Sequence, residues 1–287
     1  MKKTILLSIL LVLSCSFLSH AQWLEKKGGG YFKLSAWFLE ADQHYTNSGK
    51  IDPNATRGIF NLNLYGKYGL SDNWNIIAYI PFYVKSYQNH QVSEITNETL
   101  LEGEEFNSFG DMNLGIEYRL FKTSKFAFST SLTLGIPSGN SSGGSDGSYQ
   151  TGDGEFNQIL RFNAGTSFSL FKHSLYAKSH IGFNNKTKNF SDEVRAGIEV
   201  GTSFLESKLL LLFRSNMVKS LRNGSLDASN SNGSIFANNV EFISIGGEIA
   251  WKLTKKIGVS FGYNSAISGK VIYAAPSYNG GIFYLLK

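Results

Sequence analysis

Hydrophobic and polar residues alternate along much of the chain that follows residue 30. Successive side chains of a β-strand point to opposite faces, so a period of two predicts strands with one apolar and one polar face. In segment 58–70, for example, Phe60 and Leu62 share one face, whereas Asn61 and Asn63 share the other. The pattern indicates an all-β protein whose strands separate an apolar from a polar environment.

Repetition of this pattern predicts about twelve strands. Their expected cores are 31–45, 58–70, 74–87, 111–121, 125–136, 158–171, 175–185, 194–205, 208–220, 241–253, 257–267 and 278–286. In a barrel, an even number of antiparallel strands places both ends of the sheet on the periplasmic side.

The connections between the predicted strands alternate between very short and long. Short breaks are expected near 71–73, 123–124, 173, 206–207 and 254–255. Long connections, rich in Gly, Asn, Ser and Asp, are expected near 46–56, 87–108, 138–155, 185–192, 220–237 and 268–277. Outer-membrane barrels have tight periplasmic turns and longer outer loops, whereas a soluble β-sandwich has no reason to sort its turns by length. The predicted fold class is therefore a transmembrane antiparallel up-and-down β-barrel.

Closure of the sheet follows from a membrane location. A strand edge in hydrocarbon leaves N–H and C=O groups without partners, at a large cost for each group. We therefore expect segment 278–286 to pair with the first strand. That segment carries Tyr278, Phe283 and Tyr284, as closing strands of outer-membrane barrels often carry aromatic residues.

The polar faces of several segments carry charges, which must face a lumen if the opposite faces meet lipid. The lumen-facing candidates are Lys67, Glu117, Arg119, Arg161, Lys178, Arg195, Glu199, Arg214 and Glu248. The excess of cations favours anionic or polar solutes if the lumen holds water. Pairing of the charges across the interior would instead seal it, and both readings stay open. With about twelve strands, between filled small barrels and wide porins, a narrow passage is physically possible.

Two features depart from simple alternation. Segment 209–213 is apolar on both faces, and we expect a loop or the N-terminal residues to cover its inner face. Aromatic residues gather near the short breaks, where such side chains favour the membrane interface. They are Tyr68, Trp74, Phe121, Phe126, Phe168, Phe171, Phe204, Trp251 and Tyr284.

Residues 1–21 have the pattern of a cleaved signal peptide. Lys2 and Lys3 precede an apolar stretch over 5–18, and Ala21 ends a small-x-small sequence before Gln22. The apolar stretch is shorter than the roughly 20 residues that a membrane-spanning helix needs. Lipidation at Cys15 is the alternative. The mature barrel is expected over 22–287.

Composition narrows the function classes. Cys15 is the single cysteine of the 287 residues, so a mature chain has no disulfide and no Cys-based metal site. A formal net charge of +5, which includes Lys2 and Lys3, is no nucleic-acid signature. The mean hydropathy of -0.13 and the lack of a later long apolar run exclude helical membrane proteins. The expected partners are outer-membrane lipid, the barrel-insertion machinery and an unidentified small solute.

Other candidate chemistry is weak, and we expect no cofactor, no metal site and no enzyme activity. Segments 140–147 and 152–155 offer oxygen ligands but lack the spacing of a dedicated calcium loop. Loop 87–108 is acidic, which indicates a solvated tip or a divalent-ion bridge to lipopolysaccharide; its glutamates are Glu94, Glu98, Glu102, Glu104 and Glu105. No Ser/His/acid set stands at a motif spacing. The histidines of the mature chain are scattered: His44, His90, His173 and His180.

Three stretches resemble a family of outer-membrane barrels assigned to the MetA pathway of phenol degradation. They are 79–83 (YIPFY), 110–120 (GDMNLGIEYRL) and 132–139 (LTLGIPSG). The junction of Ala21 and Gln22 is also similar to those of exported Bacteroidetes proteins. The resemblance implies a transporter-like barrel for aromatic or other apolar compounds, and it transfers no ligand residues.

The sequence leaves three functions open. The first, which strand number and a charged inner face favour, is a channel or transporter for small solutes. The second is a lipid-modifying enzyme, which needs a Ser/His or His/acid pair on a lipid-facing rim, with His180 or His44 as candidates. The third is a structural or surface-interaction barrel with a sealed lumen.

Overall fold

The computed structural model describes residues 24–53, 57–93, 95–170, 173–226 and 234–287. The predicted signal peptide with Cys15, together with Glu94 and Phe171, lies outside these residues. No helix in the described ranges is long and apolar enough to cross a membrane.

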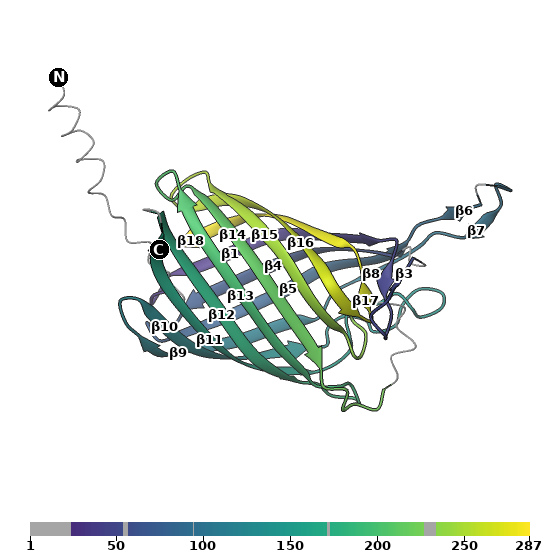
Figure 1. Cartoon of the computed structure of the whole chain (residues 1–287), viewed down its shortest axis with the longest axis horizontal. Helices are drawn as coiled ribbons and strands as arrows, with labels where there is room; N and C mark the ends of the chain where they lie inside the picture. Colours follow the sequence, from purple (N-terminus) through teal and green to yellow (C-terminus); the bar gives the residue numbers. More distant parts are fainter. Residues whose placement is uncertain (1–23, 54–56, 94, 171–172, 227–233) are drawn as a thin grey trace, which may run out of the picture.

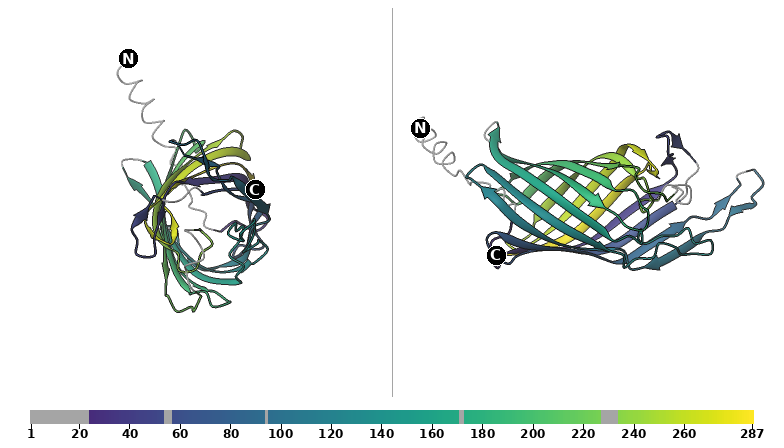
Figure 2. Two further views of the ribbon diagram at one scale, coloured as in Figure 1. Left: turned by 90° about the vertical axis from the view of Figure 1, so that its right-hand side faces the viewer. Right: turned by 90° about the horizontal axis from the view of Figure 1, so that it is seen from below.

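In this part of the chain, twelve long antiparallel strands surround a common axis, as the end-on view of Figure 2 shows. They are β1 (Gly30–Ala41), β4 (Arg57–Gly69), β5 (Trp74–Gln88), β9 (Met112–Lys122), β10 (Phe126–Ile136), β11 (Asn157–Leu170), β12 (His173–Asn185), β13 (Glu193–Phe204), β14 (Leu209–Ser220), β15 (Glu241–Lys252), β16 (Ile257–Lys270) and β18 (Pro276–Leu286). Each pairs with the long strand that follows it in sequence, which is the up-and-down order predicted.

The sheet is closed between its first and last strands. β1 pairs with β18 from Gly30 opposite Leu286 to Leu39 opposite Ser277, and on its other side β1 pairs with β4. The prediction that 278–286 closes the barrel is therefore confirmed, because no strand edge is left open along the wall formed by these pairs.

The outer face of the barrel is apolar, because the hydrophobic member of each alternating pair points outward. Exposed apolar side chains occur on all of the barrel strands: Phe32, Leu64, Ile76, Leu114, Phe128, Phe162, Ile181, Ile198, Phe213, Ile249, Phe261 and Ile282. In water such a continuous apolar surface would drive association, whereas in a membrane it contacts hydrocarbon.

The two ends of the barrel differ, as predicted from the connection lengths. The short-turn end carries the connections after β4, β9, β11, β13 and β15, and Gly30 and Leu286 also lie there. The long-loop end carries the six longer connections, of which the hairpin of β6 (Gln91–Val92) and β7 (Thr99–Leu101) projects beyond the barrel in Figure 1. Of the predicted aromatic residues, Trp74 packs on Tyr118 at a ring distance of 4.6 Å near the short-turn end.

The prediction of one strand over 31–45 is wrong at its end. β1 stops at Ala41, and His44 and Tyr45 form the separate strand β2 (His44–Tyr45), which pairs with β3 (Ile51–Asp52) and β17 (Ile272–Tyr273). Alternation continues across the turn at Asp42, so the sequence pattern alone could not separate the two strands.

The acidic loop after β5 is more ordered than predicted. β8 (Glu104–Ser108) pairs with the C-terminal part of β5, whereas β9 pairs with its N-terminal part. The change of partner occurs next to Pro81, which has no N–H to donate, and the carbonyl oxygen of Pro81 instead accepts the N–H of Gly110 at 2.8 Å. Glu105 forms an ion pair with Lys85.

Candidate functional site: the lumen of the barrel

The side chains that point away from the apolar outer face form the inner wall. Arg161, for example, lies between the outward Leu160 and Phe162 on β11. The other predicted lumen-facing residues occupy equivalent alternate positions of their strands: Lys67, Glu117, Arg119, Lys178, Arg195, Glu199, Arg214 and Glu248. Two of their ion pairs, Lys33–Glu248 and Lys67–Glu117, join strands that are not neighbours in the sheet, which requires both side chains to lie on the concave side. A role along a solute path stays a prediction.

One chain of ion pairs crosses five strands of the inner wall. Lys33 on β1 lies 2.9 Å from Glu248 on β15, and Glu248 lies 2.6 Å from Arg214 on β14. Arg214 in turn lies 2.6 Å from Glu199 on β13, and Lys178 on β12 lies 3.3 Å from the same carboxylate. Cations and carboxylates alternate, so each carboxylate is held between two positive charges. We call this set the Lys33–Lys178 network.

Glycines on the inner wall leave room for ring side chains to lie flat. The Tyr176 hydroxyl donates to Glu199 at 2.8 Å, and its ring covers Gly201, where a Cβ would overlap the ring. The His180 ring covers Gly197 in the same way. Both rings therefore lie along the wall of β12 and β13 on the inner side.

A second polar network occupies the wall of β4, β9, β10 and β11. Lys67 donates to Glu117 at 2.6 Å, and the hydroxyl of Ser129 donates to the other oxygen of Glu117, also at 2.6 Å. The amide of Asn163 donates to Ser129 at 3.2 Å. Both oxygens of the Glu117 carboxylate are therefore occupied by partners within the wall.

A third group lies toward the long-loop end and includes residues that sequence reasoning missed. Arg195 donates twice to Glu193, through Nε at 2.9 Å and Nη2 at 2.6 Å. The buried Lys186 lies 3.6 Å from Glu193 and 3.0 Å from Asp153. Glu193 is the first residue of β13 and lies just outside the predicted core 194–205, so the alternation within that core does not include it.

Arg119 and Arg161 have no carboxylate within ion-pair distance among the residues that the structure describes. The Nε atom of Arg161 is buried and has no hydrogen-bond partner there. We call these two residues the arginine pair. Neither guanidinium group forms an ion pair with a carboxylate of the described residues.

The N-terminal segment 24–29 crosses the short-turn end. Gly28 donates its N–H to the carbonyl oxygen of Gly69 at 2.8 Å, and Gly69 donates to Gly29 at 2.9 Å. The N–H of Lys27 bonds the carboxylate of Asp72 in the turn after β4 at 3.1 Å. These bonds attach the segment to the rim of the barrel.

The residues just before these bonds lie inside the wall. Leu24 is 1% exposed, and Asn75, which is fully buried, can accept the N–H of Glu25 at 2.7 Å and donate to its carbonyl oxygen at 3.1 Å. Burial raises the pKa of Glu25, and the charges of Lys67 and Lys178 oppose that rise. Because these lysines belong to β4 and β12, Glu25 lies within reach of two separate parts of the inner wall.

The apolar segment 209–213 has one face on each side of the barrel wall. Leu210 and Leu212 face inward and are half-buried, whereas Leu211 and Phe213 are exposed on the outer face. The inward leucines lie at the short-turn end, where the N-terminal segment also lies. A cover over the inner face near 209–213 stays a prediction.

At the long-loop end, loops cover part of the inner wall with apolar side chains. Inward residues of β1, β4 and β5 form a buried cluster with residues from the connections on either side of β15 and β16: Leu39, Ala41, Ile59, Val84, Tyr273 and Ala275, with Trp37, Ile235 and Phe236 packed against them. The inner wall of β1, β4 and β5 is therefore apolar near the long-loop end, whereas it carries charged side chains nearer the short-turn end.

The connection 137–156 also lies against the inner side. Arg57, the first residue of β4, places its guanidinium 4.1 Å from the centre of the Tyr149 ring and donates to Ser148 at 2.7 Å. β4 and the loop between β10 and β11 are far apart in the sheet order. The loop must therefore extend across the mouth of the barrel, so that the long-loop end is narrowed from this side as well.

Asp111, between β8 and β9, anchors the same connection. Its carboxylate accepts the N–H of Gly139 at 2.9 Å and the N–H of Asp153 at 2.7 Å. Burial raises the pKa of Asp111 to about 6, and the nearby Asp153 carboxylate adds to the rise, whereas the two N–H bonds oppose it. The anchor is therefore sensitive to pH.

The histidines and the oxygen-rich loop segments lie in separate parts of the described ranges. His180 lies on the inner wall, away from a lipid-facing rim, and the Nδ1 atom of His44 is buried without a partner. His90 lies 3.3 Å from Glu102, but both side chains are exposed in the loop after β5. No group of three or more metal-ligating side chains occurs among these residues, the segments 140–147 and 152–155 included.

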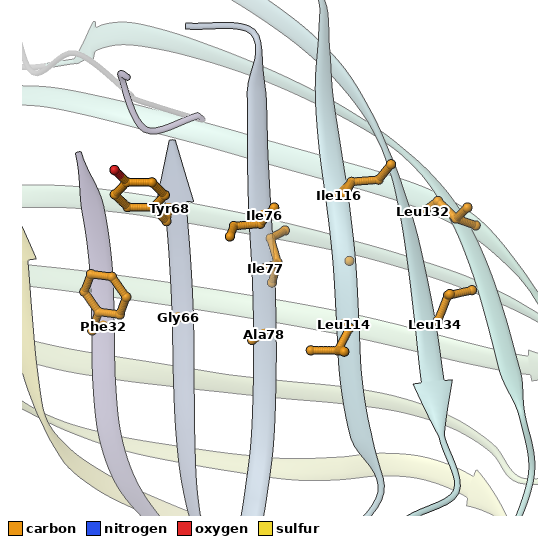
Figure 3. Close-up of a pocket in the computed structure, with 11 residues that line it drawn as sticks. Phe32, Gly66, Tyr68, Ile76, Ile77, Ala78, Leu114, Ile116, Leu132 and Leu134 are labelled. Atoms are coloured by element: carbon orange, nitrogen blue, oxygen red, sulfur yellow. The ribbon is translucent and has the colours of Figure 1, made fainter. Parts of the chain in front are cut away.

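A hollow of about 490 Å³ lies on the outer face, over β1, β4, β5, β9 and β10 (Figure 3). Its lining is apolar: Phe32, Gly66, Tyr68, Ile76, Ile77, Ala78, Leu114, Gly115, Ile116, Leu132 and Leu134. Phe32, Leu114 and Leu132 are among the exposed apolar side chains of the outer face. The hollow is therefore part of the lipid-facing surface and lies outside the charged lumen.

Solved structures share this architecture. An outer-membrane channel from Pseudomonas putida F1 matches with a TM-score of 0.56 and 11% identity, covering 94% of this chain and 99% of that one. The β-domain of the Bordetella autotransporter BrkA matches with a TM-score of 0.51 and 14% identity, covering 90% and 99%. The chain thus has the fold of an outer-membrane β-barrel, as predicted.

Sequence comparisons add no family. No family model matches the chain, and no curated protein matches it. The resemblance to the phenol-degradation barrels is not confirmed. A channel and an autotransporter domain thus share this fold at low sequence identity, so the fold alone does not choose between their functions.

Proposed function

We propose that the protein is a narrow diffusion channel of the outer membrane for small polar solutes, with a preference for anions. The observation that supports this most directly is the division of the closed barrel into an apolar outer face and a charged inner wall. A wall of buried ion pairs is costly to desolvate, so it is more compatible with a lumen that holds water than with a dry core.

The class of solute follows from the charge of the wall. The inner cations outnumber the inner carboxylates, and the arginine pair lacks a described carboxylate partner. Fixed positive charge in a narrow passage raises the local concentration of anions. Aromatic or apolar solutes, which the family resemblance implied, would have to pass the same charged wall, and we place them second.

Conductance in planar lipid bilayers tests the proposal. The exported chain, purified with its loops intact, is expected to give discrete current steps, with a reversal potential in a KCl gradient that shows anion preference. Swelling of liposomes in small polar solutes should agree. Absence of both current and solute entry would exclude the channel.

A sealed barrel with a surface role is the second candidate. The apolar cluster at the long-loop end and the N-terminal segment at the other end both reduce the free section of the lumen. If this candidate is correct, no current flows, and an outer partner should protect the long loops from hydrogen exchange. The two outcomes are mutually exclusive.

The expected partners follow from the membrane location. We propose that the cell's barrel-insertion machinery inserts the protein into the outer membrane. We also propose that the apolar outer face contacts membrane lipid. Depletion of the insertion machinery in cells should reduce the folded protein in the outer membrane while its synthesis continues.

A further inference from the structure

The positive charges of the inner wall are neutralised unevenly. Five cations of the wall each have a carboxylate partner: Lys33, Lys67, Lys178, Arg195 and Arg214. The arginine pair has none among the described residues. The arginine pair on β9 and β11 therefore carries positive charge without an ion pair in the described part of the chain, in addition to Arg57 at the long-loop end and to the Lys33–Lys178 network, in which three cations share two carboxylates.

Strand register brings the arginine pair to one patch. Arg119 lies opposite Ser129, and Ser129 lies opposite Asn163 on the next strand. Arg161 is two residues from Asn163 and therefore shares its face of β11. Both arginines thus start from the same side of the lumen, and Ser129 and Ser131 of β10 lie between their strands.

The charge of the nearest candidate carboxylate, Glu117, is already balanced by Lys67. Glu117 attracts Arg161, but its two oxygens bond Lys67 and Ser129 at 2.6 Å each. On the other side, Arg161 lies opposite Gly182, and Gly182 lies opposite Arg195. Gly182 places no side chain between the two arginines, and the positive charge of Arg195 repels that of Arg161.

We propose that the arginine pair binds the carboxylate of a small anionic solute inside the lumen. The guanidinium fork matches the two oxygens of a carboxylate, and a charge-assisted bond of this kind is stronger than a neutral one. Asn163 and His180, which is close to Arg161, supply further hydrogen-bonding groups on the same wall. The proposal rests on the proposed function in that the solute must reach the lumen.

Fluorine NMR with trifluoroacetate as the probe measures such binding without any need for conductance. The folded protein in detergent micelles should broaden the fluorine line of trifluoroacetate in a saturable manner. The double variant Arg119→Gln/Arg161→Gln should bind roughly tenfold more weakly, because charge-assisted bonds are lost. Heat-dependent mobility in gels verifies that each variant is folded.

A matched control separates a site from general charge. Lys219 and Arg222 both pair with Glu241 at the long-loop end, away from the arginine pair, so Lys219→Gln/Arg222→Gln removes the same charge. Its affinity for trifluoroacetate should stay unchanged. Equal loss in both double variants, or no loss in the first, overturns the proposal. If the first double variant does not fold, Arg161→Lys keeps the charge without the fork and should still weaken binding.

Conductance distinguishes failure of the site from failure of the channel. If the wild type conducts and the Arg119→Gln/Arg161→Gln variant keeps its anion preference and its block by trifluoroacetate, the site is overturned while the channel stands. If no current flows but the NMR difference is present, the site stands and the channel is excluded.

Discussion

Lys33 on β1 lies 2.9 Å from Glu248 on β15, although β18 and β16 separate their strands in the sheet. Such a contact requires both side chains to extend along the concave inner side. The bond joins the first strand of the barrel to the last third of the chain, across the seam where the sheet closes. Closure is therefore supported by the inner wall as well as by the backbone ladder between β1 and β18.

Arg214 is the residue on which the Lys33–Lys178 network depends most. It bonds Glu199 and Glu248 at 2.6 Å each, so Arg214→Leu leaves two carboxylates without their shared partner. We expect the free energy of unfolding to fall by roughly 1–3 kcal/mol, the cost of leaving charged groups unsatisfied. Urea unfolding in lipid vesicles, followed by tryptophan fluorescence, measures it.

The control for this prediction removes the carboxylates together with the arginine. Because Lys33 and Lys178 then lose their carboxylate partners as well, Glu199→Gln/Glu248→Gln in the Arg214→Leu background should lower the stability further than Arg214→Leu alone. Arg214→Lys, with a single ammonium group, should fall between the wild type and Arg214→Leu. A leucine variant as stable as the wild type would show that the network contributes nothing to folding.

The division between outer face and inner wall is testable on a single strand. Phe261 on β16 is 57% exposed on the outer face, whereas Asn264 lies on the inner face. Phe261→Lys should destabilise the barrel in lipid by about 2–4 kcal/mol if the residue lies near the bilayer midplane. Asn264→Lys should cost much less, because a lumen-facing ammonium stays hydrated. The same urea titration compares the two, and similar losses would contradict the assigned faces.

Period-two alternation was sufficient to predict the barrel strands. It gave the position of each of the twelve within a few residues, because every barrel strand has one face in an apolar and one in a polar environment. It failed where both sides are polar. Glu104 lies on β8 and accepts bonds from the backbone N–H and hydroxyl of Ser145, an order that depends on a loop distant in sequence.

Candidate lumen residues were predictable, but their partners were not. Lys33 could have been found, because it alternates with the outward Phe32 and Leu34 in the first predicted strand. Its partner Glu248 could not, because pairing around a barrel depends on the stagger of every strand between them. The same holds for the arginine pair, because its lack of a carboxylate partner can be seen only after the partners of the other charged residues are known.

Acidity should strengthen the attachment of connection 137–156 to the barrel rim. The pKa of Asp111 is raised from 3.8 to about 6, chiefly by burial, so the attached state binds a proton more readily than the detached state. The stabilisation is full below about pH 4 and is lost as the pH rises through about 6. Hydrogen exchange of the Gly139 and Asp153 amides, corrected for intrinsic rates, should therefore be slower at about pH 4.5 than at about pH 7. The first pH is about one and a half units below the pKa of Asp111, and the second is about one unit above it.

Asp111→Asn is the control for this pH dependence. The amide keeps an oxygen to accept one N–H, but it does not titrate in this range. The corrected exchange of Gly139 should then be nearly independent of pH, whereas that of amides in β13 should be unaffected by the substitution. A pH dependence that persists in the asparagine variant would assign the effect to another group.

The N-terminal segment should be released by a side chain at Gly69. A Cβ there would overlap the carbonyl group of Lys26 and crowd that of Glu25, so Gly69→Val cannot keep segment 24–29 in place. Leu24 and Glu25 would then leave the short-turn end, and we expect a larger conductance per channel. Single-channel recording of the variant and the wild type under the same salt conditions measures the change.

Gly280→Ala provides a glycine substitution that the barrel should tolerate. A Cβ at Gly280 would lie 3.8 Å from the nearest atom, the carbonyl oxygen of Ser260, which is an ordinary contact. Its conductance should equal that of the wild type. Protease access separates release from a general loosening of the barrel: in Gly69→Val, cleavage near Lys26 and Lys27 should become rapid while cleavage in the long loops is unchanged. If Gly69→Val conducts like the wild type although its N-terminal segment is cleaved, the segment does not limit the passage.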